Sequence, residues 1–213
     1  MMYYFQNRDV MSQDLFAEAN NSNNNHVHRN RVINLFSDIN PEVCNEIIER
    51  VLIWEEEDNE ILYRHSLMAK QVDDPKTLLK PIIININSYG GSVYDLFGLV
   101  DALKSLKAPI ITRAYGKICS AAFILFCIGD ERYVGPNCTL MYHSLRGMCK
   151  GTPGIIDNRI SHDKLMQKHL DKLAIEKTGL TMKLLKEWKD TNLDKYLTPK
   201  EAIELNIATG YLY

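Results

Sequence analysis

Residues 81–92, Pro-Ile-Ile-Ile-Asn-Ile-Asn-Ser-Tyr-Gly-Gly-Ser, decide the fold of this chain of 213 amino acids. The first seven are rich in β-branched side chains, which is typical of a buried central strand in a parallel sheet. Gly90 and Gly91 end the strand, and apolar side chains then recur at helical spacing from Val93 to Leu103. The stretch therefore predicts a strand, a glycine turn and a helix in direct succession, which is the beginning of a β-α-β unit.

The same alternation of strand and helix continues on both sides of this stretch. Strands are expected at 31–36, 110–114, 132–134 and 139–142, and helices from Pro41, after Ser120, at 155–177 and at 183–189. Because strands and helices alternate along the chain, the predicted fold class is α/β with crossover connections. One domain is expected, covering residues 31–213.

Two segments stand apart from this pattern. Residues 1–30 contain an Asn-rich run and bury almost nothing apolar, so they are expected to form a flexible arm. Residues 59–80 have weak periodicity and are expected to be an excursion, partly helical over 60–69. The acidic run before it, at 55–58, is expected to end the preceding helix as a solvated surface.

Composition and charge exclude several classes of function. The chain has 46% hydrophobic and 24% charged residues and a net charge of -2, so neither a nucleic-acid partner nor an anionic membrane is expected. No apolar run reaches the roughly 18 residues of a membrane-spanning helix, and the first ten residues lack the pattern of a signal peptide. The five cysteines include no Cys-x-x-Cys pair. Reduced thiols and a cytoplasmic or equivalent intracellular location are therefore expected.

Small residues mark two strand-to-helix junctions, where sites form in open α/β sheets. Gly90 and Gly91 follow one strand, and Gly116 lies four residues before Ser120 at the end of the next. Glycine lets a backbone N–H approach a ligand, and a helix that begins after Ser120 presents unpaired N–H groups suited to an oxyanion. Each feature also has an ordinary interpretation: a turn for the glycines, an N-cap for Ser120, and a buried, hydrogen-bonded side chain for His143.

Four blocks of sequence, spread over most of the chain, change the weight of these interpretations. They are Asn-Ile-Asn-Ser-Tyr-Gly-Gly-Ser at 85–92, Gly-Lys-Ile-Cys-Ser-Ala-Ala at 116–122, Pro-Asn-x-x-Leu-Met-Tyr-His at 136–143, and Leu-Asp-Lys-Tyr-Leu-Thr-Pro-Lys-Glu-Ala at 193–202. In this order they resemble the proteolytic subunit of the Clp protease (ClpP), over about residues 31–213. The resemblance implies the ClpP/crotonase-type α/β fold of repeated β-β-α units with a protruding strand-helix handle.

Residue by residue, the resemblance implies a serine-protease triad. Ser120 matches the nucleophile, His143 the base, and Asp194 the acid that orients the histidine. Gly91 and Ala121 match the residues whose backbone N–H groups form the oxyanion hole. Such a set is chemically complete, because the histidine takes the serine proton, the carboxylate supports the imidazolium, and two amides stabilise the tetrahedral oxyanion.

The chain departs from the family pattern near these residues. Asp190, four residues before Asp194, is an alternative acid, but the spacing of Asp194 to the Thr-Pro-Lys-Glu-Ala block matches the family. Tyr89 stands where the family usually has Pro. Leu193 stands where many members carry an Arg that couples ring contacts to the active site. Residues 59–80 resemble an insertion of roughly twenty residues, so the way in which partners dock is open.

The resemblance also implies partners. It predicts a serine endopeptidase that acts on unfolded proteins and peptides inside stacked rings of seven copies, fed by a hexameric Clp-type ATPase unfoldase. The helix expected at 155–177 could supply an apolar face for ring contact, made of Ile160, Leu165, His169 and Leu173. No metal or organic cofactor is implied. The chain lacks a Gly-x-x-x-x-Gly-Lys-[Ser/Thr] loop, so ATP would be used by the partner.

Three other functions stay open at this point. A crotonase-like acyl-CoA enzyme shares the fold and places backbone amides around an oxyanion, but it needs no Ser–His pair. A catalytically silent ring subunit would only shape a complex, and the intact Ser120, His143 and Asp194 argue against it. A Ser-Lys peptidase would have to use Lys117, which lies three residues before the serine and is a poor candidate.

Overall fold

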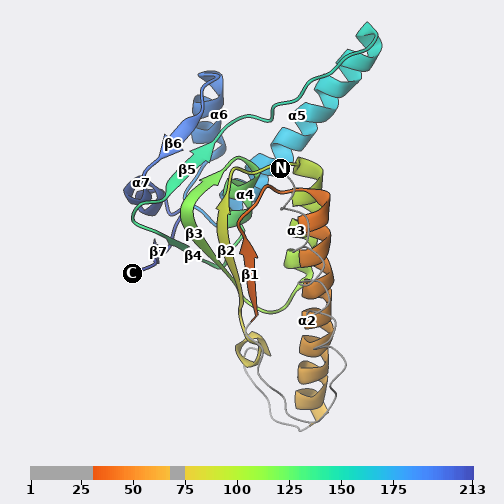
Figure 1. Ribbon diagram of the computed structural model, residues 1–213, viewed down its shortest axis with the longest axis vertical. Helices are drawn as coiled ribbons and strands as arrows, with labels where there is room; N and C mark the ends of the chain where they lie inside the picture. The colour runs from red at the N-terminus through yellow and green to blue at the C-terminus, as the bar shows by residue number, and fades with distance from the viewer. Residues whose placement is uncertain (1–30, 68–74) are drawn as a thin grey trace, which may run out of the picture. The chain divides into compact units, whose positions relative to one another are not determined.

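A mostly parallel sheet organises the part of the chain that the computed structural model describes, residues 31–67 and 75–213. Five strands lie side by side and pair in parallel, in the order β1 (Val32–Leu35), β2 (Ile82–Ser88), β3 (Ile110–Cys119), β4 (Glu131–Val134) and β7 (Gly210–Tyr211), as Figure 1 shows. Strand β5 (Thr139–Tyr142) is parallel to the end of β3, and β6 (Lys195–Leu197) is antiparallel to β5. The predicted α/β class is confirmed. The arm predicted at residues 1–30 lies outside the described residues.

Strand β2 occupies the central position that its composition predicts, but only one of its faces is fully covered. Ile82, Ile84 and Ile86 are at most 1% exposed, because alternate side chains point to the same face of a strand. The side chains between them are half-buried. One of these, Asn85, donates from Nδ2 to Oδ1 of Asn34 on β1 at 2.8 Å. The second face of the sheet therefore carries both polar and apolar side chains and is partly open in a single chain.

The helices cover the buried face. Helix α3 (Val93–Ser105) packs against α2 (Pro41–Leu67), and α4 (Ala121–Cys127) contacts α3, β2 and β3. All seven residues of α4 are buried, so the helix is apolar on every side, which is typical of a core helix. A short 3-10 helix, η2 (Pro75–Leu78), precedes β2. No helix in the described ranges is long and apolar enough to cross a membrane.

Helix α2 corrects the prediction that the acidic run at 55–58 ends a helix on a solvated surface. The helix continues to Leu67, and Asp58 is only 2% exposed. Arg31, which is also buried, donates from Nη1 to Asp58 Oδ1 at 2.6 Å. Burial raises the pKa of Asp58, and the hydrogen bond from Arg31 opposes that rise. The charge can be buried because it is paired, and sequence periodicity does not reveal such pairing. Of the helix predicted at 60–69, residues 60–67 are a continuation of α2, and 68–69 lie outside the described residues. That 59–80 is an insertion stays a prediction.

Helix α5 (Pro153–Glu176) is buried only in its second half. Met166, Leu170 and Ala174 face the core, whereas the first half projects away from the sheet (Figure 1) with exposed side chains that include Ile160. This is the helix of the expected handle. The strand of the expected handle is absent from residues 143–152, which lead from β5 to α5, and a strand there would need a partner with which to pair its N–H and C=O groups. The chain ends with α6 (Met182–Asp190) and α7 (Pro199–Glu204).

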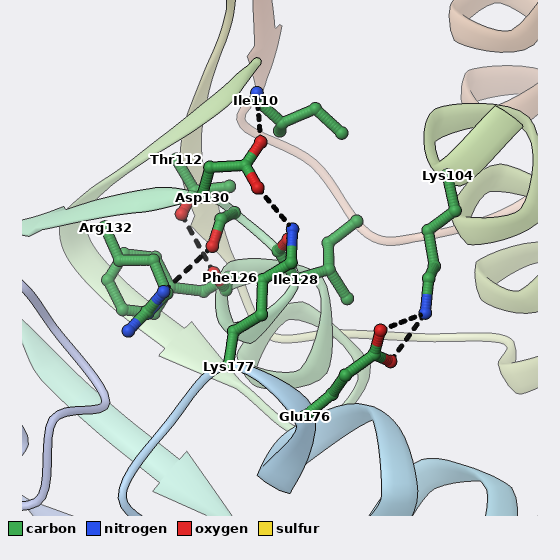
Figure 2. A network of polar contacts seen from close by, with 10 residues as sticks. Lys104, Ile110, Thr112, Phe126, Ile128, Asp130, Arg132, Glu176 and Lys177 are labelled. Atoms are coloured by element: carbon green, nitrogen blue, oxygen red, sulfur yellow. Dashed lines mark hydrogen bonds and ion pairs between the residues drawn. The ribbon is translucent and has the colours of Figure 1, made fainter. Parts of the chain in front are cut away.

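Polar side chains hold the end of α4, as Figure 2 shows. Lys177 donates from Nζ to the carbonyl oxygen of Ile128 at 2.8 Å and forms an ion pair with Asp130 at 2.7 Å. Thr112 on β3 donates from Oγ1 to the carbonyl oxygen of Phe126 at 2.8 Å. The last carbonyl groups of a helix have no partner within the helix and attract cations. These contacts therefore fix α4 from the end opposite to Ser120.

Arg132 completes this arrangement from β4. It is 2% exposed, and its guanidinium donates to the carbonyl oxygens of Gly129, Asn206 and Ile207 at 2.9, 3.0 and 2.8 Å. Burial lowers the pKa of Arg132. The side chain thus joins the turn after α4 to the turn after α7.

Candidate active site

Ser120 lies between β3 and α4 with a backbone conformation that non-glycine residues rarely adopt. Its φ is 55° and its ψ is -122°, which is strained for a residue with a Cβ. Its N–H donates to the carbonyl oxygen of Met141 on β5 at 2.8 Å. Ser120 occupies the N-cap position of α4, but its side chain makes no capping hydrogen bond to the helix, so the hydroxyl is not used as a cap. A strained serine on a sharp strand-to-helix turn has the geometry of an exposed nucleophile.

The glycine turn after β2 packs directly against Ser120. Gly90 has φ 101°, and a Cβ on it would lie 2.9 Å from the Cβ of Ser120. Gly91 has φ 146°, and a Cβ there would lie 2.1 Å from the carbonyl oxygen of Ile39. The turn is anchored to the same segment, because Ile39 N–H donates to Gly90 O at 2.7 Å. Glycine is therefore required at both positions for two reasons: the positive φ and the close approach of neighbouring atoms.

One cavity contains the serine, the histidine and both predicted oxyanion donors. Its volume is about 230 Å³, and Gly91, Ser120, Ala121 and His143 all line it. Among the residues that the structure describes, the N–H groups of Gly91 and Ala121 donate to no acceptor. Two free amide donors on the wall that contains a strained serine can stabilise an oxyanion formed on a substrate carbonyl.

His143 follows β5 and is half-buried. Its Nδ1 lies 2.5 Å from the carbonyl oxygen of Ser144. A carbonyl oxygen can only accept, so Nδ1 donates this hydrogen bond, and in the neutral ring Nε2 is then the acceptor. This is the tautomer that a general base of the serine-protease type needs. The described contacts include no hydrogen bond between Ser120 and His143.

Asp194 lies just before β6, and its carboxylate does not meet His143. It forms an ion pair with Arg146, whose Nη2 contacts Oδ1 of Asp194. Arg146 lines the cavity, and Asp194 does not. The carboxylate is nevertheless close to the junction: burial is the main cause of the raised pKa of the Cys119 thiol, and the charge of Asp194 contributes in the same direction.

Asp190, the alternative acid, occupies a different environment. It is at the end of α6, its side chain is 61% exposed, and it pairs with Lys186 one helical turn earlier at 2.5 Å. The side chain of Asp194 is 26% exposed. Asp194 is thus the less exposed of the two candidate acids, and the described contacts join neither of them to the histidine.

Lys117 is turned away from the serine. Its Nζ lies 4.2 Å from the centre of the Tyr89 ring and 3.5 Å from Oδ1 of Asn87. It does not line the cavity that contains Ser120. A Ser-Lys pair is therefore not supported, and Tyr89 has a defined role as the ring beneath this cation.

Gln167 on α5 is a residue of the site that the sequence interpretation missed. Its Oε1 accepts from Leu145 N–H at 2.6 Å, two residues after His143. Its Nε2 donates to Asp171 Oδ1 at 2.8 Å and to the hydroxyl of Tyr142 at 3.2 Å. Tyr142 in turn donates to Asp171 at 2.6 Å. The signal available in the sequence was the polar pair at 167 and 171, one helical turn apart among apolar positions.

The buried end of this network is charged. Asp171 is 1% exposed and pairs with Nζ of Lys189 on α6. Burial, together with the hydrogen bond to Asp171, raises the pKa of the Tyr142 phenol well above its usual range. The network therefore ties α5 and α6 to the end of β5, directly before His143. No group of three or more His, Cys, Asp or Glu side chains in the described ranges is arranged to hold a metal ion.

Comparison with protein families identifies the chain. The family model for Clp protease matches residues 17–209, a range that contains the serine, the histidine, both candidate acids and both amide donors. The match covers nearly the whole chain and begins within the predicted arm. On the strength of this match, the chain belongs to the Clp protease family.

Proposed function

We propose that this ClpP-like peptidase is a serine endopeptidase that hydrolyses peptide bonds of unfolded proteins and peptides through an acyl-enzyme. The nucleophile is Ser120, the base is His143, and the acid is Asp194. The observation that carries the proposal is that a strained serine shares one cavity with a histidine and with two unpaired amide donors.

The chemistry follows from these groups. His143 Nε2 accepts the proton of the Ser120 hydroxyl as Oγ attacks the carbonyl carbon of the substrate. The oxyanion that forms accepts hydrogen bonds from the N–H groups of Gly91 and Ala121. The C–N bond breaks when His143 returns the proton to the leaving amine. A water molecule, deprotonated by the same histidine, then hydrolyses the ester and restores the serine.

The acid has to change its partner for this reaction. Asp194 must reach Nδ1 of His143, which the carbonyl oxygen of Ser144 holds in this structure. Until then the Ser144 carbonyl keeps the correct tautomer but cannot offer the negative charge that supports an imidazolium. This arrangement favours a second candidate, a silent ring subunit, if the exchange never occurs.

Assembly belongs to the same proposal. The half-buried face of the sheet and the projecting half of α5 leave surface for other copies of the chain. By resemblance, the copies form stacked rings of seven, and a hexameric Clp-type ATPase unfolds the polypeptide substrates. A protease that encloses its sites in this way needs its ATPase partner to reach folded proteins, whereas short peptides should enter unaided.

The test is cleavage of a fluorogenic peptide by the wild type and by Ser120→Ala, with the native mass measured in the same samples. We expect activity in the wild type and a loss of at least about 1,000-fold in Ser120→Ala. Ser144→Ala is the matched control, because it removes a neighbouring hydroxyl and keeps the carbonyl that holds His143. Equal cleavage by wild type and Ser120→Ala would refute the mechanism. A folded, assembled and inactive wild type would favour the silent subunit.

A further inference from the structure

Arg146 lines the cavity that contains His143 and forms an ion pair with Asp194, the candidate acid. We propose that Arg146 is a positioning residue that binds Asp194 and thereby sets the fraction of molecules in which this carboxylate is available to His143. The inference rests on the proposed function, because it assigns Asp194 to the triad.

The structure shows one arrangement, and the proposal adds a second in which the same groups have other partners. In the structure, Arg146 holds Asp194, and the Ser144 carbonyl holds Nδ1 of His143 at 2.5 Å. In the productive arrangement, Asp194 accepts from Nδ1 of His143, and the carbonyl of Ser144 and the guanidinium are both released.

Arg146 is placed so that it can make this exchange. It lies three residues after His143, in the segment 143–152 that forms no strand. The hydrogen bond from Leu145 N–H to Gln167 anchors the segment immediately before Arg146, and everything from 146 to 152 is exposed. A change in the path of the exposed part therefore moves Arg146 directly while His143 stays in place.

The surroundings of Asp194 contain no second strong competitor. Within the described ranges, Arg146 is the only cation that forms an ion pair with it. The preceding residue, Leu193, is 71% exposed and apolar, so it supplies no charge. The occupancy of the pair with Arg146 therefore decides how much carboxylate is left for the histidine.

The expected change in kcat follows from the exposure of the Arg146 side chain. The side chain of Arg146 is 61% exposed, and an ion pair of this kind is weak because solvent and salt screen it. Removing it should therefore raise kcat by about two- to five-fold. A small change in kcat is what a positioning residue should produce, because molecules with and without the Arg146–Asp194 ion pair are both populated.

Arg159 provides a matched control. It lines the same cavity as Arg146, but its ion pair is with Asp163 on its own helix, at 2.8 Å. Arg159→Gln therefore removes the same charge from the same wall without releasing Asp194. An effect of lost cavity charge on KM should appear in both variants. The rise in kcat should appear only in Arg146→Gln.

The experiment measures kcat and KM on a fluorogenic peptide for Arg146→Gln, Arg146→Leu, Arg146→Lys and Arg159→Gln, at equal native mass. We expect the first two to raise kcat, and Arg146→Lys to behave nearly as wild type because it keeps the ion pair. In an Asp194→Asn background, Arg146→Gln should change kcat by less than about 1.5-fold, because the two substitutions act on one contact. Added salt should raise kcat of the wild type more than that of Arg146→Gln.

The outcomes separate the two proposals. If Ser120→Ala cleaves the peptide as fast as the wild type does, the proposed function fails. If cleavage depends on Ser120, but Arg146→Gln and Arg146→Leu lower kcat or leave it unchanged, the role of Arg146 is wrong and the function stands. An equal rise in kcat for Arg146→Gln and Arg159→Gln would also refute it, since Arg159 does not touch Asp194.

Discussion

A single methyl group added at Gly90 should both destabilise the fold and displace Ser120. In Gly90→Ala the new Cβ would lie 2.6 Å from the carbonyl oxygen of Cys119 and 2.8 Å from the N atom of Ala121. These are backbone atoms, which cannot rotate away as a side chain can. The φ of 101° at Gly90 costs a residue with a Cβ on the order of 1–3 kcal/mol by itself. With the contacts included, we expect a loss of about 2–4 kcal/mol in the free energy of unfolding.

Gly98 supplies the matched control within the next helix. It lies inside α3, and a Cβ there would have only Ile48 Cδ1 near it, at 3.9 Å. Alanine in an open helix interior is more stable than glycine by about 0.5–1 kcal/mol. The same chemical change should therefore stabilise the protein at Gly98 and destabilise it at Gly90.

Thermal unfolding at one protein concentration, combined with the rate of fluorophosphonate labelling, measures both effects. For a domain of this size 1 kcal/mol corresponds to roughly 2–4 °C in Tm, so Gly90→Ala should lower Tm by about 10 °C and slow the labelling of Ser120. Gly98→Ala should raise Tm slightly and label at the wild-type rate. A Gly90→Ala protein that is as stable and as reactive as the wild type would refute the packing of the glycine turn against the serine.

Three further predictions follow from the contacts around the site. Arg132→Met should lower the free energy of unfolding by about 3–5 kcal/mol in denaturant titration, because two buried carbonyl groups and a part-buried one lose their donor; a loss below about 1 kcal/mol would contradict this. Gln167→Leu should lower kcat about ten-fold with little change in KM, because the segment after the histidine loses its anchor, and unchanged kinetics would count against the network. Thiol titration at pH 8 should find one fast thiol per chain, the exposed Cys149. Burial raises the pKa of Cys44 to about 11 and of Cys127 to about 12, so their reactive thiolate forms only at higher pH. A fast-reacting thiol in the Cys149→Ser variant at pH 8 would refute this.

The sequence predicts the strands and helices that present the site because their apolar periodicity is strong. The β-branched run of β2 and the glycine turn after it were identified directly, and Ser120 was placed correctly at the junction of β3 and α4. Two short strands, β6 and β7, were missed. They have three and two residues, too few for a periodic pattern to register.

Charged residues mark the limit of this kind of prediction. Asp58 belongs to an acidic run that predicts a solvated surface, yet Arg31, 27 positions earlier, makes its burial possible. Arg146 and Asp194 are 48 positions apart, and no sequence pattern near either residue predicts their ion pair. Hydrophobic periodicity is local, whereas the partner of a charge is set by tertiary structure.

The central claim is that Ser120 is a nucleophile activated by His143, and mapping a fluorophosphonate adduct by mass spectrometry tests it most directly. The wild type should carry one adduct per reacting chain, on Ser120, and His143→Ala should label at least about 100-fold more slowly because the base is absent. Labelling at another residue, or labelling of Ser120 at the same rate without the histidine, would contradict the account.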